Sequence, residues 1–301
     1  MDYNSILSSL PNEIIMDLAE HNDLPGDLLK QLQGPYGQLD YSKPNSITVD
    51  NTGVWEMTDK GLTVFNLNNI LQLTGVRINR INMLYCADMT DTSMDCFKLA
   101  LCGWYDLLVI WEGTDPQKTP AKIVLQNRKL TAILESTPKY IPAAKIVVFH
   151  VNSTVPALTN FLIRFLTQWS QERISLQLRK SYIGLWIVGP ALESFKNDKM
   201  RSLELDPDHY KLSEYEFNDI IEWMTTKAKH DAYYFRVGWQ DGKVFNNLKK
   251  KWGMNAMDTK DINQFQVSSH RDKVTVLVKK KLYDPAIEIS VSLSSSSVQA
   301  S

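Results

Sequence analysis

The spacing of short apolar triplets constrains the fold of this 301-residue sequence more than any other feature. In each triplet two apolar residues flank a third residue of any kind, as in a short β-strand whose side chains alternate between two faces. Successive triplets start 18, 26, 14, 26, 27, 27 and 32 residues apart. This recurrence predicts a fold built from similar units. The triplets begin at Phe65, Met83, Val109, Ile123, Phe149, Leu176, Leu203 and Phe235.

Helix-like segments lie between most of the triplets. Residues 154–170 and 213–228 carry apolar side chains three and four positions apart, which is the pattern of an amphipathic helix. Ser213 and Glu216 have the spacing of a capping box at the start of the second of these helices. Pro190 is expected to break a helix over 182–195. The weaker helical patterns cover residues 91–103, 127–136, 182–195 and 241–252.

A strand and a helix repeated every 26 to 32 residues predict parallel strands, because antiparallel neighbours are usually joined by short turns. Units of this length are typical of a leucine-rich-repeat-like horseshoe, although the asparagine expected after each strand is missing from most units. The alternative is an ordinary α/β domain with evenly spaced strands. We therefore expect an α/β fold, with a degenerate leucine-rich-repeat-like domain over residues 41–261.

The pattern changes in the last part of the chain. Residues 263–267, 273–279 and 286–293 alternate with period two and have no helical segment between them. They predict a small antiparallel β cap over residues 262–293. The serine-rich tail, residues 294–301, is expected to be disordered.

Composition indicates an ordinary globular protein, with 44% hydrophobic residues and 33 basic against 34 acidic side chains. The N-terminus lacks the basic region of a signal peptide, and the longest uncharged stretch is too polar to span a membrane. Cys86, Cys96 and Cys102 are expected to be free thiols, because an odd number without an export signal favours a reducing compartment. We expect a cytoplasmic or nuclear location.

No motif in the sequence indicates an enzyme. The five histidines are scattered, the cysteine spacings match no zinc pattern, and the glycine-rich motifs of nucleotide-binding proteins are absent. The segment Asp206–His209 is interpreted as a turn rather than a metal or acid–base site. We therefore expect no catalytic residues, no metal and no cofactor.

Charge is distributed unevenly along the chain. Residues 1–60 have a net charge of −7, and residues 243–281 have a net charge of +7. The lysine-rich segment either meets an acidic partner or is simply solvated, and lysines near a helix C-terminus also complement the helix dipole. Nucleic-acid binding is not expected, because the sequence pI is near 6.5.

The middle residues of the regular triplets are expected to form one exposed row, because they point away from the buried flanking residues. This mixed polar row suits recognition of a target protein. Trp239, beside Gly238 in an expected loop, is a further binding candidate. The row comprises His150, Gln177, Glu204 and Arg236, and Ser175, Arg179, Asp206 and Tyr234 lie on the same expected face.

Two short helices are predicted in residues 8–33, with Pro11 at the start of the first and Leu24–Pro25 between them. This segment resembles an F-box in its Leu10–Pro11 opening and in its Asp23–Pro25 turn. The helical segments Glu13–Ile15 and Asp27–Leu29 match as well. The third F-box helix is missing, because Gly34–Gly37 interrupts the chain. With degenerate repeats behind it, the sequence is similar to the expanded nematode F-box families.

The resemblance implies a substrate receptor of a cullin-type ubiquitin ligase. Residues 1–40 would bind a Skp-type adaptor, and the repeats would bind an unknown target protein. The alternative is a non-enzymatic repeat scaffold without ligase contact, in which the same N-terminal residues only cap the first repeat. The adaptor contacts implied by the resemblance are Leu10, Pro11, Ile14, Ile15, Leu18, Leu24, Leu28 and Leu29.

Overall fold

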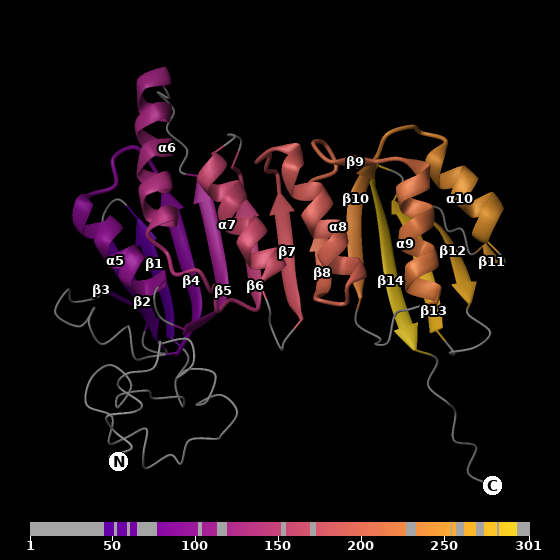
Figure 1. Ribbon diagram of the computed structural model, residues 1–301, viewed down its shortest axis with the longest axis horizontal. Coiled ribbons are helices and arrows are strands. Elements are labelled where there is room, and N and C mark those ends of the chain that lie inside the picture. The colour runs from indigo at the N-terminus through magenta and orange to yellow at the C-terminus, as the bar shows by residue number, and fades with distance from the viewer. Residues whose placement is uncertain are drawn as a thin grey trace, which may run out of the picture. The chain divides into compact units, whose positions relative to one another are not determined.

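The structure is a computed structural model of an α/β protein (Figure 1), which confirms the expected class. It divides into two compact units, described separately below. Unit 1 comprises Met1–Ile146 and Val155–Gln168, and unit 2 comprises Val147–Thr154 and Trp169–Ser301. The residues described are 45–50, 53–58, 61–64, 77–101, 104–112, 119–151, 155–168, 173–226, 233–253, 255–256, 262–268, 274–281 and 283–293.

The sheet of unit 1 is mixed. Its strands lie in the order β3, β2, β1, β4, β5. The parallel pairs are β1 with β4 and β4 with β5, whereas β2 pairs antiparallel with both β1 and β3. The antiparallel edge, residues 45–64, was not predicted from the sequence. The strands are β1 (Asn45–Asp50), β2 (Gly53–Thr58), β3 (Gly61–Val64), β4 (Arg77–Tyr85) and β5 (Trp104–Glu112).

The described part of unit 1 contains three helices: α5 (Asp91–Leu101), α6 (Pro120–Glu135) and α7 (Pro156–Thr167). The expected strand at Ile123–Leu125 is wrong, because these residues lie inside α6. Thr119 caps this helix by accepting a hydrogen bond from the Lys122 backbone N–H at 3.3 Å, and Pro120 occupies the first turn. Both signals favour a helix start.

The helix α7 confirms the amphipathic pattern, since Phe161, Leu162 and Phe165 are fully buried. It is fixed to the preceding connection by Arg164, which donates to the Thr137 hydroxyl at 2.9 Å and to the Pro138 carbonyl at 3.1 Å. The short strand β6 (Lys145–Phe149) precedes α7, and the boundary between the two units falls within it.

The sheet of unit 2 begins with parallel strands and ends with an antiparallel meander. Its order is β7, β8, β10, β14, β13, β12, β11. The pairs β7–β8 and β8–β10 are parallel, and β14 pairs antiparallel with both β10 and β13. The strands are β7 (Ile174–Arg179), β8 (Met200–Glu204), β9 (Lys211–Leu212), β10 (Tyr234–Trp239), β11 (Asn255–Ala256), β12 (Ile262–Ser268), β13 (Val274–Lys281) and β14 (Ala286–Leu293).

The last three strands, β12 to β14, confirm the predicted antiparallel pairing of residues 262–293. Their alternation has a physical basis, because Phe265, Val276, Val278 and Ile289 are fully buried on the helix side of the sheet. The expected disordered tail, residues 294–301, lies outside the described residues.

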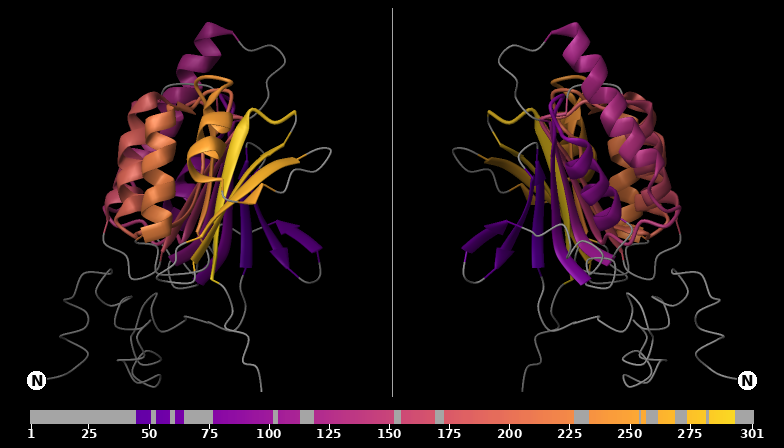
Figure 2. Two further views of the ribbon diagram at one scale, coloured as in Figure 1. Left: turned by 90° about the vertical axis from the view of Figure 1, so that its right-hand side faces the viewer. Right: turned by 90° about the vertical axis from the view of Figure 1, so that its left-hand side faces the viewer.

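Helices cover one face of the unit 2 sheet (Figure 2). They are η3 (Leu185–Ile187), α8 (Val188–Lys196), α9 (Glu214–Thr226) and α10 (Val244–Trp252). Phe195 of α8 joins the helix layer to the sheet, since its ring lies 5.3 Å from that of Trp223 and 5.5 Å from that of Phe235. Large aromatic rings therefore form the core on this face.

Two sequence signals in these helices had different outcomes. The capping box is confirmed, because the Glu216 N–H donates to the Ser213 hydroxyl at 3.3 Å and the Ser213 N–H donates to the Glu216 carboxylate at 2.8 Å. The expected break at Pro190 is wrong. The helix α8 begins at Val188, so Pro190 lies in the first turn, where a backbone N–H has no intrahelical partner in any case.

Candidate interaction surface on unit 2

The face of the unit 2 sheet opposite α8, α9 and α10 is polar. Strand alternation produces it, since Leu176, Leu203 and Phe235 are fully buried on the helix side and their neighbours point the other way. The pairing of the strands brings these neighbours into two rows. The charged row runs through Gln177, Glu204, Arg236, Glu288 and Lys279, from β7 to β13.

The second row carries hydroxyl groups. Ser175 of β7 lies opposite Ser202 of β8, which lies opposite Tyr234 of β10. Tyr234 in turn pairs with Ser290 of β14. All four residues are half-buried. A band of donors and acceptors therefore runs alongside the charged row across four strands, and we call this band the hydroxyl row.

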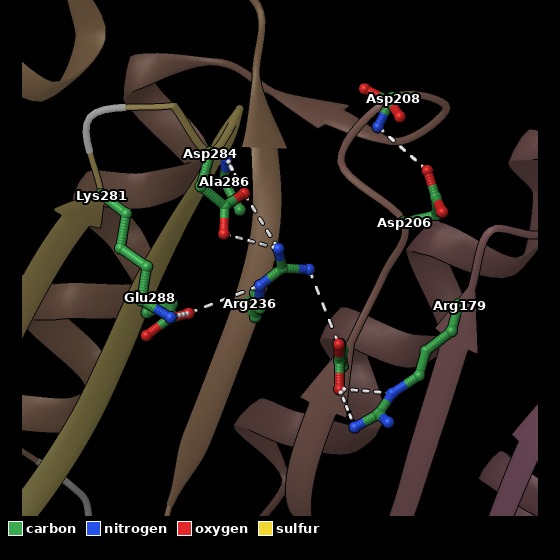
Figure 3. Close-up of polar contacts among 9 residues, drawn as sticks. Arg179, Asp206, Asp208, Arg236, Lys281, Asp284, Ala286 and Glu288 are labelled. Atoms are coloured by element: carbon green, nitrogen blue, oxygen red, sulfur yellow. Dashed lines mark hydrogen bonds and ion pairs between the residues drawn. The ribbon is translucent and has the colours of Figure 1, made fainter.

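Arg236 is the centre of the charged row (Figure 3). Its Nη2 donates to both carboxylate oxygens of Asp284, at 2.9 and 2.8 Å. Its Nη1 lies 3.6 Å from Glu204 Oε1, and its Nε lies 3.5 Å from Glu288 Oε1. One guanidinium thus holds three carboxylates, and its planar set of donors suits this geometry.

Two further cations complete the cluster at its ends. Arg179 donates from Nε and Nη2 to Glu204 Oε2, at 3.2 and 3.0 Å. Lys281 Nζ lies 3.3 Å from Glu288 Oε1. Three cations and three carboxylates therefore balance. The charge cluster comprises Arg179, Glu204, Arg236, Lys281, Asp284 and Glu288.

The cluster also changes the acidity of Arg236 and of the neighbouring Tyr234. Burial alone would lower the pKa of Arg236, but the hydrogen bond and charge of Asp284 and the charge of Glu204 raise it above its ordinary value. Burial, followed by the nearby Glu288 and Glu204 carboxylates, raises the pKa of Tyr234 to about 12. The guanidinium of Arg236 therefore stays charged and the phenol of Tyr234 stays protonated over the physiological pH range.

The structure brings together three of the five predicted target-binding residues. Gln177, Glu204 and Arg236 lie on adjacent strands in register and on one face, as the alternation predicted. Their expected exposure is wrong for two of them, because Gln177 is only 8% exposed and Glu204 only 9%. Arg179 and Arg236 pack against Glu204 from both sides, and this pairing makes its burial possible.

The other two predicted residues lie elsewhere. His150 follows β6 and has a positive φ of 57°. Its N–H donates to the Arg179 carbonyl, so His150 lies level with Arg179 rather than with Gln177. Trp239 is the last residue of β10 rather than part of a loop, and it is half-buried. It lies on the helix side with Phe235 and Val237, and the Lys280 ammonium sits 4.6 Å from its ring centroid.

The same-face candidates Arg179 and Tyr234 belong to the cluster surface, but Asp206 has a local role. Its carboxylate accepts the Asp208 N–H at 3.0 Å in the turn that follows β8, as the turn interpretation predicted. Sequence reasoning missed Asp284 and Glu288. The period-two pattern of residues 286–293 could have placed Glu288 on the polar face, whereas Asp284 lies in a turn and its contact with Arg236 spans 48 residues.

Other predicted features fall outside the cluster. All the proposed adaptor contacts, Leu10 to Leu29, lie outside the described residues. Lys249 to Lys251 occupy the last turn of α10, where they complement the helix dipole. Cys86 and Cys96 are free thiols as expected, and Cys96 is buried in α5. Cys102 lies outside the described residues.

No group of three or more histidine, cysteine, aspartate or glutamate side chains in the described ranges could hold a metal ion. None of the helices in the described part of the chain is long and apolar enough to cross a membrane.

Comparison with known proteins leaves the family open. No protein-family model matches the sequence, and neither a curated protein nor a solved structure matches it significantly. Functional inference therefore depends on the polar face itself. A fixed and balanced set of charges is suited to recognising a surface of complementary charge, because such groups contribute specificity and orientation more than raw affinity.

Proposed function

We propose that this chain is a non-enzymatic protein-binding subunit that acts as the substrate receptor of a cullin-type ubiquitin ligase. Its target protein would bind the polar face of unit 2. The observation that carries the proposal is the in-register row of Gln177, Glu204 and Arg236 on three parallel strands. These strands hold the row on rigid elements, so little conformational entropy would be lost on binding.

The charge cluster supports recognition because its geometry is already formed. Arg236 is held by Asp284, which also accepts the Ala286 N–H at 3.0 Å. A target would therefore meet side chains that do not need to be ordered on binding. The hydroxyl row adds groups that can accept or donate hydrogen bonds to a partner backbone.

The N-terminal segment provides the second half of the proposal. Residues 1–40 resemble an incomplete F-box and would dock on a Skp-type adaptor through Leu10, Ile14 and Leu18, with the other residues of the motif around them. A receptor of this kind would act in the cytoplasm or the nucleus. The alternative is a repeat scaffold that binds a protein through the same polar face and has no ligase contact.

We also propose that residues 41–261 are a degenerate leucine-rich-repeat-like horseshoe. Support comes from β7, β8 and β10, which follow one another as parallel neighbours with a helix in each connection. The ordinary α/β alternative is favoured by the antiparallel strands beside them, since β14 pairs with β10 and β2 pairs with β1. Both arrangements would leave the polar row on one face.

Adaptor binding is tested by a pull-down of purified Skp-type adaptor with the full chain. We expect the wild-type chain to retain the adaptor and the variant Leu10→Asp plus Ile14→Asp to lose it. The matched control is Val124→Asp plus Leu125→Asp, because these residues of α6 are 51% and 46% exposed and the change is the same. Absence of wild-type retention, or equal loss in the control, would favour the scaffold alternative.

Target binding is tested by crosslinking in cell extract followed by mass spectrometry. A photoreactive residue in place of Ser202, at the centre of the polar face, should capture a specific protein. The same residue in place of Glu222, on the exposed side of α9, is the control. Identical captured proteins at both positions would contradict the assignment of the polar face.

A further inference from the structure

The carboxylates of the charge cluster lie deeper than its outer cations. The side chains of Glu204, Glu288 and Asp284 are 12%, 18% and 20% exposed. Those of Arg179 and Lys281 are 48% and 54% exposed. A partner that approaches this face therefore meets positive charge at the two ends of the cluster, although the cluster as a whole is neutral.

The outer cations also have unused hydrogen-bonding capacity. Arg179 directs Nε and Nη2 to the same Glu204 oxygen, so Nη1 has no acceptor among the described residues. Lys281 has three N–H donors and contacts one carboxylate, that of Glu288. Lys279 lies opposite Glu288 in the strand register, and in the described ranges its ammonium forms no ion pair. The cations at each end of the cluster can therefore bind one more carboxylate.

We propose that the polar face binds an extended acidic segment of the target protein, which crosses the strands from β7 to β13. This inference rests on the proposed function, because it names the chemistry of the protein that the face would bind. One acidic group of the segment pairs with Arg179, and another pairs with Lys279 and Lys281. Between these ends the segment crosses over Glu204, Arg236 and Glu288, and the hydroxyl row lies beside its path.

The spacing of the two acidic groups follows from the sheet. Strands β7 and β13 are four strand steps apart, through β8, β10 and β14. At about 4.8 Å per step the two cationic ends are about 19 Å apart, and an extended chain covers that distance in about six residues. The segment would therefore carry acidic residues at positions about six apart.

The middle of the cluster selects against other polyanions. A nucleic-acid strand carries a phosphate about every 3.4 Å along a duplex axis, so some phosphates would lie over Glu204 and Glu288. A peptide avoids this repulsion when the residues between its two acidic ends are neutral or basic. The deep carboxylates thus act as the element that rejects a uniformly charged partner.

Fluorescence anisotropy with the full chain tests the inference at low ionic strength. The probe is a labelled ten-residue peptide with glutamate pairs six positions apart and neutral residues between them. A second peptide has the same composition but a spacing of three, and a ten-nucleotide single-stranded DNA is the third probe. We expect the six-spaced peptide to bind the wild type more tightly than either of the others.

Matched variants locate the binding surface. Arg179→Gln plus Lys281→Gln should weaken binding of the six-spaced peptide about tenfold, as expected for two lost charge contacts. Lys211→Gln plus Lys250→Gln removes the same charge from two exposed residues of β9 and α10 and should leave binding unchanged. Thermal unfolding of both variants checks that they remain folded.

Several results would overturn the inference. Equal weakening by both variants would show nonspecific attraction, and equal binding of the two peptides would contradict the crossing geometry. Tighter binding of the DNA would assign the face to nucleic acid. The adaptor pull-down is independent of these outcomes, because Leu10 and Ile14 are not part of this face. A failed peptide assay with a retained adaptor would therefore reject only the inferred target chemistry.

Discussion

Replacement of Arg236 by methionine removes the cation that contacts all three carboxylates of the charge cluster. The methionine keeps much of the side-chain volume and leaves the packing against neighbouring strands largely intact. Glu204, Asp284 and Glu288 then face each other without the central charge, although Arg179 and Lys281 still pair with the two glutamates. Asp284 loses both hydrogen bonds from the guanidinium and keeps the Ala286 N–H.

The structure sets the magnitude of this loss. Removing one partner of a fully buried ion pair costs about 3 to 5 kcal/mol, whereas an exposed pair contributes about 0 to 1 kcal/mol. The Arg236 side chain is 18% exposed, so we expect a loss near the lower end of the buried range, about 3 kcal/mol. Arg179→Met is the control. Its side chain is 48% exposed, and its loss should be below about 1 kcal/mol.

A second substitution separates charge from packing. Without the guanidinium, the three carboxylates repel one another in the folded variant. The double variant Arg236→Met plus Glu204→Gln removes one of these charges, so it relieves the repulsion but leaves the packing at position 236 unchanged.

Urea unfolding measures both effects, with tryptophan fluorescence and circular dichroism as probes. A deficit of Arg236→Met equal to that of Arg179→Met within about 0.5 kcal/mol would show that the cluster is solvated rather than buried. A deficit that the double variant does not reduce would assign the loss to packing. Either result refutes the electrostatic reasoning. Adding Glu204→Gln should recover part of the stability of Arg236→Met.

Three further predictions concern single sites. Gly238→Ala should destabilise the fold by about 2 kcal/mol in urea unfolding, because the new Cβ would lie 2.3 Å from the Pro207 carbonyl oxygen. The control Gly242→Ala should be nearly neutral, because its new Cβ would have no atom within 4 Å. Burial is the main cause that raises the pKa of Cys86 to about 12, and Asp88 adds to it. Alkylation of Cys86 at pH 8, measured by peptide mass spectrometry, should therefore be at least about a hundredfold slower than that of free cysteine. The raised pKa of Tyr234, about 12, contributes stability below pH 10, and this stability is lost between pH 10 and 12. In unfolding measured over this interval, Tyr234→Phe should therefore lose less stability than the wild type.

Local patterns predicted the elements whose signals are local. The helices α7 and α9 follow from apolar spacing, and the capping box marked the start of α9 within one residue. The expected strand at Ile123–Leu125 failed because a run of three apolar residues fits a strand and a helix equally well. Thr119 followed by Pro120 was the local signal that could have resolved it, since both favour a helix start.

Nonlocal pairing could not be predicted in the same way. In β1, Thr48 pairs with Asn82 of β4, and the Asn82 side chain donates to the Thr48 hydroxyl at 3.1 Å across 34 residues. Neither residue has a distinctive pattern around it. Period-two alternation places a side chain on a face but does not choose the neighbouring strand, because any strand with the same period offers an equivalent partner.

The charged row shows, within one surface, which features local patterns predict and which depend on contacts distant in the sequence. Alternation alone placed Gln177, Glu204 and Arg236 on a common face, because side-chain direction depends only on the local backbone. Their depth depends on long-range neighbours, since Glu204 can be buried only where cations from β7 and β10 meet it. The same pairing hides the carboxylates and leaves the outer cations in contact with solvent. Sequence reasoning thus found the surface, and the sign of the charge that it presents emerged only from contacts up to 48 residues apart.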